Sequence, residues 1–79
     1  MKLRKKPYGD ANIIGHNLER IRLQRHIKQK DFIAQMQIRG VDINPTSYSK
    51  LEGQTRIATD KEVYVASLIL GIDINELFR

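Results

Sequence analysis

The sequence lacks cysteine and tryptophan, and it has no long apolar segment. Without cysteine the chain forms no disulfide and offers no thiolate to a metal ion, a pattern that fits a reducing cytoplasm. No apolar run approaches the roughly 18–20 residues that a membrane span requires. The basic start, MKLRKKPYGD, is followed by no apolar segment and is therefore not expected to be a signal peptide. We expect a cytoplasmic protein that does not enter a membrane.

Acidic residues are missing from the first nine positions. This segment carries four basic side chains, Lys2, Arg4, Lys5 and Lys6, whereas all nine acids of the chain lie from Asp10 onward. Most of the net charge of +5 is therefore concentrated in a short N-terminal arm. A basic arm beside a folded body is typical of proteins that bind a polyanion, either nucleic acid or an anionic membrane. A solvated tail that only aids solubility is the alternative.

Residues suited to catalysis or metal binding are also scarce. The two histidines, His16 and His26, lie ten positions apart and lack the four-residue spacing of a helical ligand pair, so we expect both at the surface or at helix ends. The chain has no glycine-rich phosphate loop, no nucleophile elbow and no clustered Ser/His/Asp set. We predict no enzymatic activity, no metal, no cofactor and no small-molecule substrate.

The chain does have apolar residues at helical spacing. A length of 79 residues, with 41% hydrophobic and 29% charged residues, predicts one folded domain. Apolar side chains recur every three or four positions, as in Ile14, Leu18 and Ile21, and no segment shows the alternation of a strand. Helices are expected at about 13–26, 29–37, 44–53, 59–71 and 73–78. The predicted fold is all-α, a compact five-helix bundle at 13–79 with a basic, flexible arm at 1–12.

The expected helix ends rest on a few local signals. Asn12 or Asp10 is available to cap the first helix. Gly40 and Gly71 are expected to end the second and fourth helices. Gly53 is expected to close the third by adopting a left-handed conformation. Capping-box spacing occurs twice, in the pairs Thr59–Glu62 and Asp73–Glu76.

The segment NPTSYSKLEG, residues 44–53, predicts a short helix with an unusually polar face. Asn44 is a good N-cap, and Pro45 suits the first helical position because its missing N–H would have no partner there. Tyr48 and Leu51 lie three residues apart and are expected in the core. The remaining side chains form the polar face, namely Thr46, Ser47, Ser49 and Lys50. A DNA major groove admits one helix, and short hydrogen-bonding side chains allow close approach to the bases. An ordinary amphipathic surface helix is the alternative.

Residues 14–78 resemble the phage repressor and Cro-type helix-turn-helix family, also called the xenobiotic-response-element or lambda-repressor-like family. The matching segments occur in order: IGHNLERIR at 14–22, IKQKDFIAQM at 27–36, NPTSYSKLEG at 44–53 and ATDKEVYVASLILGIDINELF at 58–78. The link QIRGVDI, which precedes the helix at 44–53, resembles that of a subgroup in which this connection is longer than in the phage repressors. The resemblance implies a bacterial or phage regulator of transcription, a repressor, that binds double-stranded DNA sequence-specifically through the helix at 44–53.

Three positions depart from the family pattern. Ile33 stands where a small alanine is usual, which implies a wider contact between the second and third helices. Gly53 comes one residue earlier than usual. Pro45 replaces a glutamine that contacts bases in many members, so other residues must recognise the sequence.

The resemblance also implies roles for individual residues. Thr46 and Lys50, four residues apart, would contact bases, with Ser47 and Ser49 on the same groove-facing side. Contacts to the DNA backbone are implied for Gln29, Asn44 and Arg56. Independently of the resemblance, the charge of the four basic residues of the arm predicts phosphate contacts. Arg22 and Glu52 would form an ion pair that joins the first helix to the third.

Several alternatives remain open. Gln29 can be a simple helix-start residue, Arg56 a solvated cation, and Glu52 a cap of its own helix. Tyr48 is expected in the core rather than stacked on a base. The rival function is a protein-binding helix-turn-helix module such as an antitoxin or accessory factor. An anionic-membrane binder is disfavoured because the arm lacks an apolar face. A homodimer is also considered, with Ile74–Phe78 as a small apolar contact.

Overall fold

A computed structural model describes residues 7–79, so the four basic residues predicted to contact phosphates, Lys2, Arg4, Lys5 and Lys6, lie outside the described residues. The described chain forms four α-helices and one 3-10 helix: α1 (Gly15–Gln24), α2 (Gln29–Ile38), α3 (Pro45–Glu52), α4 (Asp60–Leu70) and η1 (Ile74–Phe78). It contains no strand within 7–79. The predicted all-α fold is therefore confirmed.

The predicted count of five α-helices is wrong, because the last element is a 3-10 helix of five residues. Its backbone bond from Glu76 N to the oxygen of Asp73 spans three residues, as 3-10 geometry requires. Asp73 caps this turn by accepting a bond from Asn75 N at 2.8 Å, one residue earlier than a capping box would place it. A segment this short cannot complete the longer α-helical ladder, so the tighter turn is formed.

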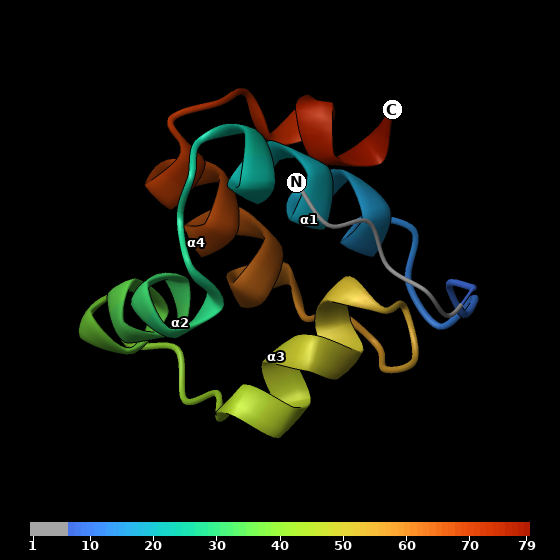
Figure 1. The fold of residues 1–79 in the computed structure, drawn as a ribbon, viewed down its shortest axis with the longest axis horizontal. Coiled ribbons are helices and arrows are strands. Elements are labelled where there is room, and N and C mark those ends of the chain that lie inside the picture. Colours follow the sequence, from blue (N-terminus) through green and yellow to red (C-terminus); the bar gives the residue numbers. More distant parts are fainter. Residues whose placement is uncertain (1–6) are drawn as a thin grey trace.

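The helices enclose one core and leave α3 at an edge of the molecule (Figure 1). α3 contacts α1 and α2, whereas α2 also packs on α4, and α1 and α4 both contact η1. The buried apolar residues come from every element: Ile14, Leu18, Ile21, Phe32, Ile33, Met36, Val41, Ile43, Tyr48, Leu51, Val63, Val65, Ala66, Leu70 and Leu77. The rings of Phe32 and Tyr48 lie 5.5 Å apart and join α2 to α3. Because α3 has neighbours on one side only, its opposite side faces outward.

Most helix ends follow the expected signals. Asn44 Oδ1 accepts a bond from Ser47 N at 2.7 Å, with Pro45 at the start of α3. Thr59 and Glu62 form a complete capping box at the start of α4. Gly71 has φ +66 and ends α4 in the left-handed conformation.

The expected left-handed conformation of Gly53 is wrong. Gly53 has φ −78, and the next residue, Gln54, takes φ +61 instead. A non-glycine residue in this region is strained unless other contacts hold it there. Gln54 has such contacts, with a segment more than forty residues earlier in the chain, and they are described below.

Candidate nucleic-acid interface

The outer face of α3 combines the residues that the sequence pattern placed there. Thr46, Ser49 and Lys50 are exposed and Ser47 is half-buried, whereas Tyr48 and Leu51 are buried. Positions 46, 49 and 50 follow helical spacing and therefore share one side of α3. This side presents two hydroxyl groups and one ammonium group, all on side chains that can bond to base edges or to phosphates.

Glu52 is the only acid of α3, and it is fully buried. Its carboxylate accepts two bonds from Arg22, at 2.6 Å from Nε and 3.2 Å from Nη2. Tyr48 Oη donates a third bond at 2.6 Å, and Gln29 Nε2 donates a fourth at 2.9 Å. The expected ion pair between Arg22 and Glu52 is thus present, within a network that joins α1, α2 and α3. Because Glu52 is buried in this network, Lys50 is the only charged side chain on the exposed side of α3.

Burial and the Glu52 carboxylate shift the pKa values of Arg22 and Tyr48. Burial lowers the pKa of Arg22, but the hydrogen bond and the negative charge of Glu52 outweigh it and raise the pKa overall. Burial raises the pKa of Tyr48 well above its usual value, and the adjacent Glu52 charge adds to the shift. Tyr48 therefore keeps its proton and remains the donor to Glu52.

We predict that Tyr48 makes the fold sensitive to alkali. Its folded-state pKa is raised, so its contribution to stability is complete below about pH 10 and is lost as the pH rises above that value. The wild type should lose up to about 1.4 kcal/mol of unfolding free energy per pH unit more than Tyr48→Phe does. Urea unfolding between pH 8 and 11.5 measures this. Tyr64→Phe, at a position that is 57% exposed, is the control and should keep the wild-type slope. Equal slopes for the wild type and Tyr48→Phe would contradict the prediction.

The Gln29 side chain was predicted to contact a phosphate, but in the structure it bonds to other residues of the protein. Its amide lies between α2 and α3, where Nε2 bonds Glu52 and Oε1 lies 3.5 Å from Ser49 Oγ. The Gln29 amide is therefore already bonded within the protein, and its expected phosphate contact stays a prediction. At the start of α2, Lys28 at the N-cap provides no side-chain cap, which leaves N–H groups for an anion, but the first turn also holds the carboxylate of Asp31.

Arg56 is neither a solvated cation nor a free phosphate ligand. It is half-buried, and its Nη1 lies 3.0 Å from Glu62 Oε2. The other oxygen of Glu62 accepts the bond from Thr59 N in the capping box. Arg56 is thus tied to the start of α4, and Glu62 offsets its charge, whereas its expected phosphate contact stays a prediction.

Residues 8–12, which the sequence pattern assigned to the flexible arm, form a strap on the folded body. Gly9 N donates to the oxygen of Gly53 at 2.8 Å, and Ala11 N donates to the oxygen of Gln54 at 2.9 Å. Gln54 Nε2 in turn donates to the oxygen of Gly9 at 3.0 Å. The strap therefore lies against the C-terminal end of α3. Gln54 carries no sequence signal for this role.

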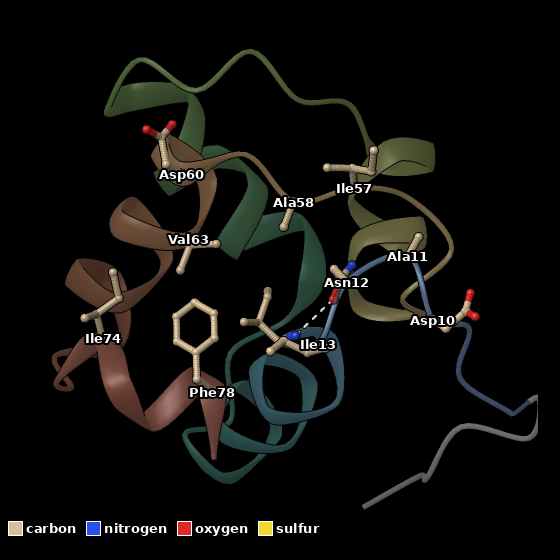
Figure 2. A pocket seen from close by; sticks show the side chains of 11 residues that line it. Asp10, Ala11, Asn12, Ile13, Ile57, Ala58, Asp60, Val63, Ile74 and Phe78 are labelled. Carbon is tan, nitrogen blue, oxygen red and sulfur yellow. Dashed lines mark hydrogen bonds between the residues drawn. The ribbon is translucent and has the colours of Figure 1, made fainter.

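Asn12, considered only as a cap, joins the strap to three parts of the fold. Its Oδ1 accepts bonds from Ile14 N at 3.1 Å and Gly15 N at 2.9 Å at the start of α1, whereas the N-cap position itself is Ile14, which provides no side-chain cap. Its Nδ2 donates to the main-chain oxygens of Leu51 at 3.0 Å and Arg56 at 2.9 Å. Figure 2 shows Asn12 beside the link that follows α3. An asparagine just before a predicted helix was the one available signal in the sequence.

An apolar hollow of about 490 Å³ lies on another part of the surface (Figure 2). Its lining is largely aliphatic and aromatic: Ile13, Ile14, Ile57, Ala58, Val63, Ile74 and Phe78. Ile57 is 75% exposed and Phe78 is 48% exposed. Asp10, Asn12 and Asp60 are the polar residues of the lining, and the Asn12 amide is already bonded within the protein. The hollow therefore offers apolar contact area rather than a set of converging polar groups.

The described residues hold no cluster of three or more histidine, cysteine or acidic side chains that could bind a metal ion. Within residues 7–79, no helix has both the length and the apolar character to cross a membrane.

Comparisons of the chain with protein-family models, with curated proteins and with solved structures find no match. Function is therefore inferred from the arrangement of α2, α3 and the strap.

Proposed function

We propose that the protein is a sequence-specific double-stranded DNA-binding regulator of transcription, a repressor of the lambda-repressor-like type, that places α3 in the major groove. The observation that supports this most strongly is the outer side of α3. It combines short hydroxyl side chains with Lys50, and the only acid of the helix is buried against Arg22. A helix with such a face can approach base edges closely without repelling the phosphates.

The packing behind α3 also suits recognition of bases. Contacts to base edges require a helix that is held in a fixed orientation. α3 is held to α2 by the Phe32–Tyr48 ring contact and by the bond from Gln29 to Glu52. Arg22 fixes the same carboxylate from α1. The polar network therefore sets the orientation of α3, and the open first turn of α2 is available for a phosphate.

The division of roles follows from reach and surroundings. Lys50 is exposed and long enough to reach guanine O6 and N7, and Thr46 on the same side can offer its methyl group to thymine. Ser47 and Ser49 add contacts through their shorter side chains, and Asn44 caps α3 close to the DNA backbone. The basic arm contributes phosphate contacts, and Arg56 a minor one because Glu62 already holds it.

We predict that Lys50→Ala weakens binding to the preferred DNA site by roughly 1–3 kcal/mol and relaxes the preference at one base position. Folding stability should change little, because Lys50 is exposed. The affinities are to be measured on the preferred site and on a scrambled duplex at one salt concentration. Lys61→Ala removes an equally exposed positive charge from α4 instead of α3 and serves as the control. An equal loss on both duplexes would make Lys50 a phosphate contact and leave recognition to Thr46 and the serines.

The second candidate is a protein-binding module, such as an antitoxin or accessory factor, and the apolar hollow favours it. Ile57 and Phe78 expose apolar area there that the DNA-binding function of α3 does not use. The same surface is available to a homodimer, which would place two copies of α3 about one helical turn of DNA apart. DNA binding that weakens steeply with salt favours the first candidate. A folded protein that binds no DNA but retains a tight protein partner favours the second.

A further inference from the structure

The amide of Gln29 has a defined orientation. It lies against the buried carboxylate of Glu52, which Arg22 holds with two bonds and Tyr48 with a third. A carboxylate paired with an arginine only accepts hydrogen bonds, so Gln29 must turn its NH2 group toward it, and Nε2 lies 2.9 Å from Glu52 Oε1. The amide oxygen of Gln29 is therefore on the opposite side of the amide carbon.

That oxygen lies beside the outer side of α3. Gln29 Oε1 is 3.5 Å from Ser49 Oγ and accepts the bond that the Ser49 hydroxyl donates. An amide oxygen has no proton to give, so the single hydroxyl proton of Ser49 is the one that lies between the two oxygens. Ser49 is exposed, and this bond is longer than most hydroxyl bonds. The contact therefore orients the hydroxyl without burying it.

The orientation decides what Ser49 can offer to a bound molecule. A serine hydroxyl has one proton and two lone pairs, and in isolation it can either donate or accept. With its proton directed at Gln29, Ser49 presents lone pairs to a molecule that approaches the outer side of α3. The neighbouring Lys50 can only donate. Two adjacent residues of α3 therefore require opposite groups from their ligand.

We infer that Gln29 is a positioning residue that makes Ser49 a hydrogen-bond acceptor for an amino group in the major groove, either adenine N6 or cytosine N4. This inference rests on the proposed function and adds the chemical group that Ser49 recognises. A guanine or thymine oxygen at the same place would meet lone pairs, and the Ser49 proton would have to leave Gln29. The net contribution of one hydrogen bond corresponds to about two- to tenfold in affinity.

The test deletes single groups from the bases of a duplex. The full-length wild type selects its preferred duplex from a random pool, and Ser49→Ala then shows at which base pair the preference depends on Ser49. At that pair, purine replaces adenine or pyrimidin-2-one replaces cytosine, which removes only the amino group. A second duplex carries a 7-deazapurine there, which removes the N7 acceptor. The loss of affinity on each duplex is compared between the wild type and Ser49→Ala, so that any effect on the duplex itself cancels.

Two substitutions of Gln29 separate its two contacts. Gln29→Met removes both the donor to Glu52 and the acceptor for Ser49, whereas Gln29→Lys keeps a donor for Glu52 and offers Ser49 no acceptor. Gln35→Met is the control, because Gln35 is an exposed glutamine of the same helix that bonds to Arg39. If Gln29→Met does not fold, Gln29→Lys provides the same comparison.

In the wild type and in Gln35→Met, deletion of the amino group should cost about two- to tenfold more affinity than it costs Ser49→Ala. This excess should disappear in both Gln29 variants, while the preferences at other base pairs remain. An excess that persists in both Gln29 variants would overturn the inference. So would an excess seen with the 7-deazapurine instead, or a Ser49→Ala variant that keeps every preference of the wild type. These results leave the proposed function intact, whereas a wild type that selects no sequence would overturn both.

Discussion

Replacing Glu52 with glutamine is expected to lower the free energy of unfolding by about 3–5 kcal/mol. The substitution keeps the shape of the side chain but removes its charge. The guanidinium of Arg22, which is nearly buried, would then lack its counter-charge, and the bonds from Tyr48 and Gln29 would lose a charged acceptor. Because this network also orients α3, DNA affinity should fall along with stability.

Urea unfolding of single and double variants tests this expectation. Replacing both partners, as in Arg22→Met with Glu52→Leu, leaves no unpaired charge and should cost less than the sum of the single losses. The Glu76–Arg79 pair is the control, since its side chains are 40% and 72% exposed and its closest atoms lie 3.7 Å apart. Breaking that pair should cost less than about 1 kcal/mol. Additive losses at Arg22 and Glu52 would contradict the network.

Neutralising the four basic residues of the arm is expected to have the largest effect on binding. Replacing Lys2, Arg4, Lys5 and Lys6 with glutamine removes up to four phosphate contacts, which should flatten the slope of log affinity against log salt by up to about 3.6. The advantage of the native arm should accordingly shrink roughly 10²-fold between 50 and 200 mM salt. All DNA sequences should be affected alike, since phosphate contacts carry no sequence information.

The measurement is a salt titration on the preferred duplex and on a scrambled one. Arg79→Gln, which removes an exposed charge from the other end of the chain, should leave the slope unchanged and is the control. A four-residue variant with the wild-type slope would show that the arm does not touch phosphate.

Local signals predicted most of the fold. The spacing of Leu18 and Ile21, and of Tyr48 and Leu51, identified the buried sides of helices because helical periodicity is a property of a short segment. The caps at Asn44 and Thr59 were predictable for the same reason. The left-handed residue after α3 was not, because Gln54 is held by a strap from the other end of the chain, and no local pattern contains that contact.

The residues of the candidate site were likewise predictable only where local spacing determines their position. The polar side of α3 follows from helical spacing, whereas the Arg22–Glu52 pair was expected only through the family resemblance. The actual partners of Gln29 and Arg56 were not foreseen. A glutamine that bonds Glu52, 23 residues away, and an arginine that bonds Glu62 are chosen by tertiary packing, and their residue types fit a phosphate contact equally well.

Selection of bound duplexes from a random DNA pool is the most direct test of the proposal that α3 recognises specific bases. We expect the wild type to enrich one preferred sequence, and Lys50→Ala to relax the preference at a single position within it. A palindromic sequence would in addition indicate a dimer with two half-sites. A folded wild type that enriches no sequence after repeated rounds would contradict the account.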